Sequence, residues 1–155
     1  MFKNIFKKTT FVSPVAGTIK NIKDVADDSF AQKMLGDGFA ITPEGNQIKS
    51  PVNGEVVFVF DTKHAIGLKA SDGLEILIHV GVDTVSLKGE GFSTHVKNNQ
   101  KVKQGDVLLT VDFDKIQSKV PSTDVIVVFS NGETCTVHEP GKTVTELEKD
   151  VITVK

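Results

Sequence analysis

Short runs of β-prone residues, separated by glycine-containing turns, recur along most of this chain. They are spaced about ten residues apart, which is typical of antiparallel sandwiches and barrels and does not suggest βαβ units. A chain of 155 residues can also bury a sizeable core within one domain. The sequence therefore predicts a compact all-β fold.

An internal repeat constrains that fold further. The pattern Ser-Pro-Val-x-Gly-x-(Ile/Val) occurs at residues 13–19 and again at residues 50–56. Proline presets φ and lacks a hydrogen-bond donor, whereas glycine permits a bulge or a tight bend. We therefore interpret the two copies as a duplicated supersecondary unit, packed face to face, whose role is structural.

One strand, at residues 75–80, places a histidine at the end of an otherwise ordinary apolar pattern. Ile76, Ile78 and Val80 alternate with Leu77 and His79, so the β-branched set suits a buried core and the histidine shares a face with Leu77. Taken alone, this pattern is explained by a half-buried histidine that bonds a backbone carbonyl.

A second histidine changes that interpretation. Residues 55–60 form a β-prone run, and if the extended chain continues, Phe60, Thr62 and His64 share one face with Phe58. Residues 65–70 predict the next strand, and the turn at residues 71–73 leads into the strand of His79. Two histidines thus lie on segments separated by one strand, which favours a functional pair.

The remaining local patterns predict smaller elements. Ser29 or Asp28 is expected to cap a short helical turn that Gly36 ends, and residues 114–119 to form another turn. The turn at residues 102–106 is expected to lead into an edge strand. A hairpin is predicted from residues 125–129 and 134–137, and a final strand at residues 151–154.

Composition excludes several functions. The net charge is −2 and all 18 basic residues are lysines, so we expect no nucleic-acid binding and no arginine fork for phosphate. No glycine-rich nucleotide loop occurs, and the single Cys135 rules out an internal disulfide framework. Residues 1–10, expected to be a flexible segment, are no signal peptide and allow at most peripheral membrane contact. We expect a cytoplasmic protein with a single domain at residues 11–155.

Four motifs, at residues 50–54, 60–65, 78–85 and 87–92, together with turns at residues 35–38 and 102–106, resemble the glucose-type enzyme IIA of the bacterial sugar phosphotransferase system. The resemblance is dense over residues 11–112. Leu77 and Val80 stand where some members carry phenylalanine, and the last 40 residues match in little beyond the strand pattern. The resemblance implies an EIIA type-1 domain, an antiparallel β-sandwich or flattened barrel of the barrel-sandwich hybrid type, with short helical turns.

The resemblance also implies a phosphotransferase component that needs no cofactor beyond a covalent phosphohistidine. His79 would accept a phosphoryl group from the carrier protein HPr and pass it to a cysteine on the IIB domain of a glucose-type permease. His64 would stabilise that group, Thr62 would orient His64, and the Gly81 carbonyl would orient His79. A regulatory docking role also fits the family. The implied partner-binding residues are Asp27, Phe30, Met34, Leu35, Phe60, Leu77, Asp83 and Val85.

Other interpretations use the same residues. Zinc needs three or four ligands, so the two histidines predict no metal in the free protein, although a partner could complete a site with them. A non-catalytic docking module is a second alternative. Biotinyl and lipoyl carrier domains share the turn and the repeat, but they need an exposed modified lysine in a tight hairpin, and no such site is found.

Overall fold

The computed structural model describes residues 10–155, so the predicted flexible segment lies outside the described residues except for Thr10. The largest sheet has the strand order β12-β1-β2-β10-β6-β5-β4-β8, and all paired strands in the described part of the chain are antiparallel. Its strands are β1 (Gly17–Asn21), β2 (Asp37–Pro43), β4 (Gly54–Val59), β5 (Ala65–Ala70), β6 (Glu75–Val82), β8 (Lys101–Val102), β10 (Ser122–Phe129) and β12 (Thr143–Val144).

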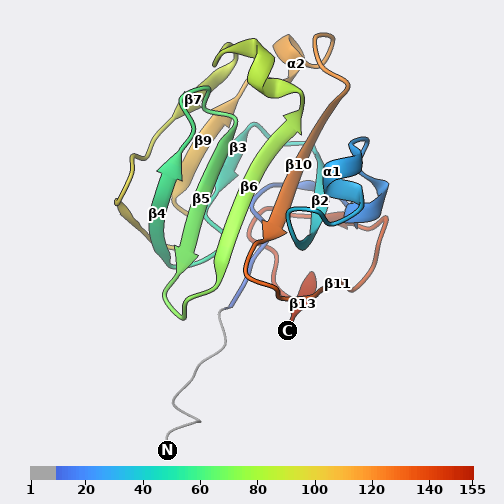
Figure 1. Ribbon diagram of the computed structural model, residues 1–155, viewed down its shortest axis with the longest axis vertical. Coiled ribbons are helices and arrows are strands. Elements are labelled where there is room, and N and C mark those ends of the chain that lie inside the picture. Colours follow the sequence, from blue (N-terminus) through green and yellow to red (C-terminus); the bar gives the residue numbers. More distant parts are fainter. Residues whose placement is uncertain (1–9) are drawn as a thin grey trace, which may run out of the picture.

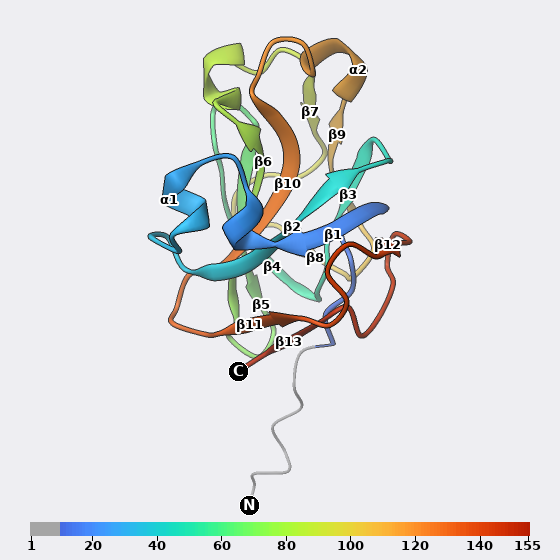
Figure 2. The ribbon, with the colours of Figure 1, turned by 90° about the vertical axis from the view of Figure 1, so that its right-hand side faces the viewer.

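Within residues 10–155, two smaller sheets and four short helices accompany the large sheet (Figures 1 and 2). The sheets are β3-β9-β7, formed by Gln47–Lys49, Val107–Val111 and Phe92–Thr94, and β11-β13, formed by Cys135–Val137 and Ile152–Val154. The helices are η2 (Ile22–Asp24), α1 (Asp28–Ala31), η3 (Thr84–Leu87) and α2 (Phe113–Ile116). The prediction of an all-β antiparallel fold with short helical turns is confirmed.

The middle of the large sheet is covered on both faces. Along β10, Val125, Val127 and Phe129 belong to the main core, whereas Ile126 and Val128 point to the other face and pack with Phe30 of α1. This second face is the smaller apolar layer formed under η2 and α1, and Figure 1 shows α1 beside β10 and β2. The site described below lies at the edge of this layer.

The repeat is built from matching hydrogen bonds. The buried hydroxyls of Ser13 and Ser50 donate to the carbonyls two residues ahead, at 2.8 and 2.7 Å. The two copies also bond each other, through the Val12 amide to Pro51 and the Lys49 amide to Pro14. These reciprocal bonds agree with the predicted duplicated unit.

The duplication extends to a turn that the sequence does not reveal. Gly54 pairs with Val102 of one turn, and Gly17 pairs with Val144 of the other. The amide of Gly105 bonds the Ser50 carbonyl, just as that of Leu147 bonds the Ser13 carbonyl. Both turn residues have positive φ, +95° and +63°. The second turn cannot be recognised from the sequence, because Leu147 occupies the position where the first turn has Gly105 and where glycine is favoured.

Several local predictions are wrong. Strand β4 ends at Val59, so the extended chain does not continue to His64. The cap of α1 is Asp27 rather than Asp28 or Ser29. Strand β9 is the middle strand of its sheet rather than an edge. No hairpin joins residues 125–129 to 134–137, because β11 pairs with β13 instead of β10. The described residues contain no helix that is long and apolar enough to cross a membrane.

Candidate active site

His79 lies in the middle of the large sheet, between two neighbouring strands. It pairs with Ala65 of β5 on one side and with Ile126 of β10 on the other. The strand alternation turns Ile78 and Val80 into the main core and leaves the imidazole on the opposite face. There the Phe30 ring lies 4.8 Å from the imidazole, measured between ring centroids and tilted by 58°.

A tight turn, rather than an extended strand, carries His64 to this place. Lys63 adopts the left-handed conformation at φ +63°, and the amide of Phe60 bonds the carbonyl of Ala65 at 3.0 Å. A hydrogen bond of 2.6 Å joins the Thr62 hydroxyl to His64 Nδ1, and the Val80 amide donates to the His64 carbonyl. The turn therefore fixes both the ring and the backbone of His64 beside β6.

The two imidazoles are in contact and continue a chain of aromatic rings. Their centroids lie 4.8 Å apart and their planes are almost perpendicular, at 82°. Phe60 makes an edge contact with His64 at 5.3 Å, and Phe58 lies 5.2 Å from Phe60. Gly67 leaves space for the row of rings, because a Cβ there would lie 2.3 Å from the Phe58 ring. The pair is thus walled by Phe30 on one side and by Phe60 on the other.

The surroundings keep His79 neutral. Burial, and secondly the neighbouring His64, lower its pKa from 6.5 to about 4, against opposing contributions from the Gly81 backbone and Asp27. Burial also lowers the pKa of His64, whose side chain is only 3% exposed. By exposed area His64 is buried and His79 is half-buried. Both rings are therefore neutral at neutral pH.

The two ring nitrogens of His79 differ in their surroundings. His79 Nδ1 is buried and accepts or donates no hydrogen bond among residues 10–155. The Gly81 backbone favours the protonated ring, yet that contact falls short of hydrogen-bond geometry, so the orienting role of Gly81 stays a prediction. Nε2 is the nitrogen left for chemistry.

Thr84 is a supporting residue that sequence patterns did not single out. Its buried hydroxyl donates to the Val80 carbonyl at 2.5 Å and closes the turn that begins at Gly81. Gly81 itself has φ +78°, and a Cβ there would lie 2.4 Å from the Thr84 methyl group. The only signal in the sequence is a hydroxyl residue shortly after a glycine, which is too common to be informative.

Exposed apolar side chains lie just after α1, β4 and β6. We call Met34, Leu35, Phe60 and Val85 the apolar rim. Leu77 packs beside Phe30, which is itself buried at 5% exposure, in the layer under α1. Asp27 lies at the start of α1, whereas Asp83 is exposed and left-handed at φ +61° after β6. The rim consists of Met34, Leu35, Phe60 and Val85, which are 70, 49, 45 and 54% exposed.

The other histidines and the cysteine lie elsewhere. His95 and His138 are exposed and bond the hydroxyls of Thr110 and Thr153. Burial raises the pKa of the Cys135 thiol to about 12, which disfavours a thiolate. No cluster of three or more metal-ligating side chains occurs in the described part of the chain, so His64 and His79 could supply only two ligands.

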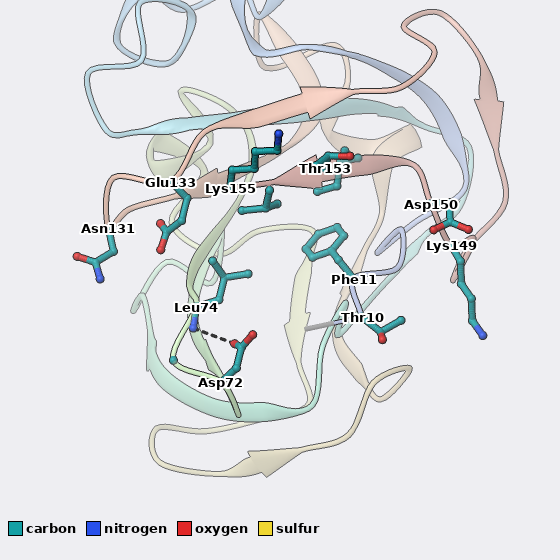
Figure 3. Close-up of a pocket in the computed structure, with 13 residues that line it drawn as sticks. Thr10, Phe11, Asp72, Leu74, Asn131, Glu133, Lys149, Asp150, Thr153 and Lys155 are labelled. Carbon is teal, nitrogen blue, oxygen red and sulfur yellow. Dashed lines mark hydrogen bonds between the residues drawn. The ribbon is translucent and has the colours of Figure 1, made fainter. Parts of the chain in front are cut away.

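A cavity of about 700 Å³ lies away from both histidines (Figure 3). It is formed by the turn between β5 and β6, by residues after β10 and by the last strand, and Glu133 Oε1 is buried there with no partner among the described residues. The register of β5 and β6 places this turn at the opposite end of the strand pair from His79. The cavity is therefore separate from the imidazole pair.

Comparison with known proteins yields one consistent family. Residues 9–135 match the model of the phosphoenolpyruvate-dependent sugar phosphotransferase system, EIIA 1. The chain is similar to the "PTS system glucose-specific EIIA component" of Bacillus cereus, at 48% identity over 84% of this chain and 83% of the relative. It is 48% identical to the "PTS system glucosamine-specific EIICBA component" of Bacillus subtilis, over 79% of this chain and 19% of that protein. The solved glucose permease IIA of Mycoplasma capricolum superimposes with a TM-score of 0.81, at 39% identity, over 99% of this chain and 98% of that one.

Proposed function

The chain belongs to the EIIA 1 family of the phosphoenolpyruvate-dependent sugar phosphotransferase system, and from that membership we propose that it is a phosphocarrier between HPr and a sugar permease. His79 accepts the phosphoryl group from phosphohistidine on HPr, and a cysteine of the IIB domain takes it away. The observation that carries the proposal is the contact of two neutral imidazoles, 4.8 Å apart, of which one has its Nδ1 buried.

The first transfer exchanges one nitrogen–phosphorus bond for another. The lone pair on Nε2 of neutral His79 attacks phosphorus, and the electron pair of the breaking bond returns to the donor nitrogen of HPr. An imidazole with a pKa of about 4 has that lone pair free at neutral pH. In the second transfer a sulfur–phosphorus bond forms on IIB as the bond to His79 breaks.

His64 stabilises the group in transit. If the Thr62 hydroxyl donates to Nδ1 across their 2.6 Å hydrogen bond, the proton of neutral His64 stays on Nε2. That N–H then donates to a phosphoryl oxygen, in a transfer that depends mainly on positioning and charge stabilisation. The chain has no arginine, so any guanidinium at the transition state must come from the partner.

The apolar rim and the two acidic residues suit partners that bind in turn. Exposed Met34, Phe60 and Val85 provide apolar contact, and Asp27 and Asp83 provide negative charge for basic groups of HPr or IIB. A docked partner that covers these residues also excludes water from the phosphohistidine. The relative named EIICBA supports a IIB domain as the second partner. We place this exchange in the cytoplasm.

Reconstitution tests the proposal. The protein is incubated with phosphoenolpyruvate, enzyme I and HPr, and we expect one acid-labile, base-stable phosphate per chain. The His79→Gln variant should carry none, while His95→Gln, at an exposed histidine outside the site, should label normally. Full labelling of the His79 variant, or labelling only with ATP, would reject the proposal.

A further inference from the structure

The carboxylate of Asp27 connects the partner-facing surface to the reactive imidazole. Its Oδ1 accepts hydrogen bonds from the amides of Ser29, at 2.8 Å, and Phe30, at 3.4 Å, and so caps α1. The ring of Phe30, within this same turn, lies against His79. One side chain therefore holds the segment that presents an aromatic wall to the imidazole.

A helix as short as α1 depends on its cap more than a long helix does. It contains four residues, and the first four amides of any helix lack a partner within the helix. Nucleation of a single turn is unfavourable without such bonds. Burial of Phe30 among Ile22, Val25 and Val82 keeps the ring inside the apolar layer. The amide of Phe30 is itself one of the two that Asp27 holds, so the cap also restrains the backbone from which the ring reaches His79.

The same carboxylate keeps a second oxygen for other contacts. No hydrogen bond or ion pair to Oδ2 occurs in the part of the chain that the structure describes, and the Asp27 side chain is partly exposed. A cationic group of a partner can therefore reach Oδ2 while Oδ1 keeps its two amides. Asp27 is also close enough to His79 to attract its protonated form.

We propose that Asp27 is a positioning residue for His79: its Oδ1 holds the single turn of α1, and with it the Phe30 ring that lies against the imidazole. This inference rests on the proposed phosphotransfer for its kinetic consequence, but its structural part stands without it. The negative charge of Asp27, which the proposed function uses for docking, is a separate property of the same side chain.

Two substitutions separate the cap from the charge. Asp27→Asn keeps a side-chain oxygen that caps as well as aspartate does, whereas Asp27→Ala removes both cap and charge. Phe30→Leu removes the ring itself, and Asp24→Ala removes an exposed carboxylate of the same surface as a matched control. Unfolding midpoints identify any variant that is not folded.

The first readout is the proton chemical shift of the His79 ring, measured by NMR at pH 8 without any phosphoryl donor. Phe30→Leu should remove the Phe30 part of the ring-current shift and leave that of His64. Asp27→Ala should move the shift toward the Phe30→Leu value, and Asp27→Asn and Asp24→Ala should leave it unchanged. A wild-type shift in folded Asp27→Ala, with the expected change in Phe30→Leu, would overturn the proposal.

The second readout is transfer from phosphorylated HPr. Asp27→Asn should raise KM with kcat retained, whereas Asp27→Ala should also lower kcat, by about fivefold if the stability of one lost helix cap appears in full in the transition state. Equal kcat values in the two variants would show that only charge matters and would overturn positioning. If wild type accepts no phosphate, the proposed function fails, and the NMR result still decides on the cap.

Discussion

The two ends of the β5–β6 pair differ: one end carries the two histidines and the other borders the cavity. At one end His64 and His79 meet on a largely covered face with neutral rings in contact. At the other end the turn at residues 72–74 borders a cavity of about 700 Å³, lined by both acidic and basic side chains. Figure 3 shows Asp72, Glu133, Lys149 and Asp150 around that space.

A large pocket is the usual first choice for a binding site, and here that choice points away from the imidazole pair. A carrier that exchanges a phosphoryl group with other proteins needs an accessible reactive atom and an apolar rim, because the partner itself closes the site. The histidine face has such a rim and the proposed phosphoacceptor, whereas the cavity lining contains none of the four histidines and not the single cysteine. Enclosed volume is therefore a poor guide for this chain.

The largest effect should follow from removing one imidazole of the pair. His64→Gln should still accept phosphate from HPr, because His79 keeps its buried setting. Onward transfer to IIB should slow by about 100-fold, because the flexible glutamine amide does not hold a donor where the fixed imidazole N–H lies. Single-turnover chase with a purified IIB domain measures this rate. Onward transfer at the wild-type rate would remove His64 from the mechanism.

An effect of similar size should appear in the pH dependence of stability. The pKa of His79 is about 4 in the folded protein against 6.5 ordinarily, so the unfolded chain binds the proton first as the pH falls. The free energy of unfolding should thus decrease between pH 6.5 and 4, by up to about 3 kcal/mol from this group. His64 acts in the same direction.

Urea unfolding of wild type and His79→Gln at pH 7 and pH 4.5 isolates this contribution, since other titrating groups are common to both proteins. The variant should lose less stability on acidification than wild type. Parallel losses in the two proteins would show that His79 is not desolvated as described.

The smallest effect should come from the cavity end. Glu133→Gln neutralises the buried carboxylate oxygen and lies far along the strands from His79. We expect the rate of transfer from phosphorylated HPr to change by no more than about twofold, as for substitutions remote from a site. A tenfold loss in this variant, in folded protein, would mean that the two ends are coupled.

Sequence patterns predicted strands correctly where the local alternation of apolar residues agrees with the packing of the core. The alternation at residues 75–80 and the turn at residues 71–73 are local signals, so the placement of β5 and β6, and of His79 opposite the main core, could be predicted. The mispredicted hairpin at residues 125–137 fails for a non-local reason. The Cys135 amide bonds Asp37, almost a hundred positions earlier, and β11 pairs with the last strand.

The site was predictable in its members but not in its construction. The resemblance supplied both histidines and Thr62, yet the left-handed Lys63 that makes the turn has no sequence signature. The contact between Phe30 and His79 depends on how α1 folds over β10, which a pattern of apolar positions does not specify. The cavity could not be foreseen, because it forms between segments distant in sequence.

The most direct test of the central claim is to identify the phosphorylated atom. NMR correlation of phosphorus with nitrogen in the uniformly ¹⁵N-labelled, phosphorylated protein distinguishes every imidazole nitrogen. The buried Nδ1 predicts phosphorus on Nε2 of His79, with amide shifts around residues 62–64 and 79–84 and none around residues 72–74. Phosphorus on Nδ1, on another histidine, or on a residue beside the cavity would contradict it.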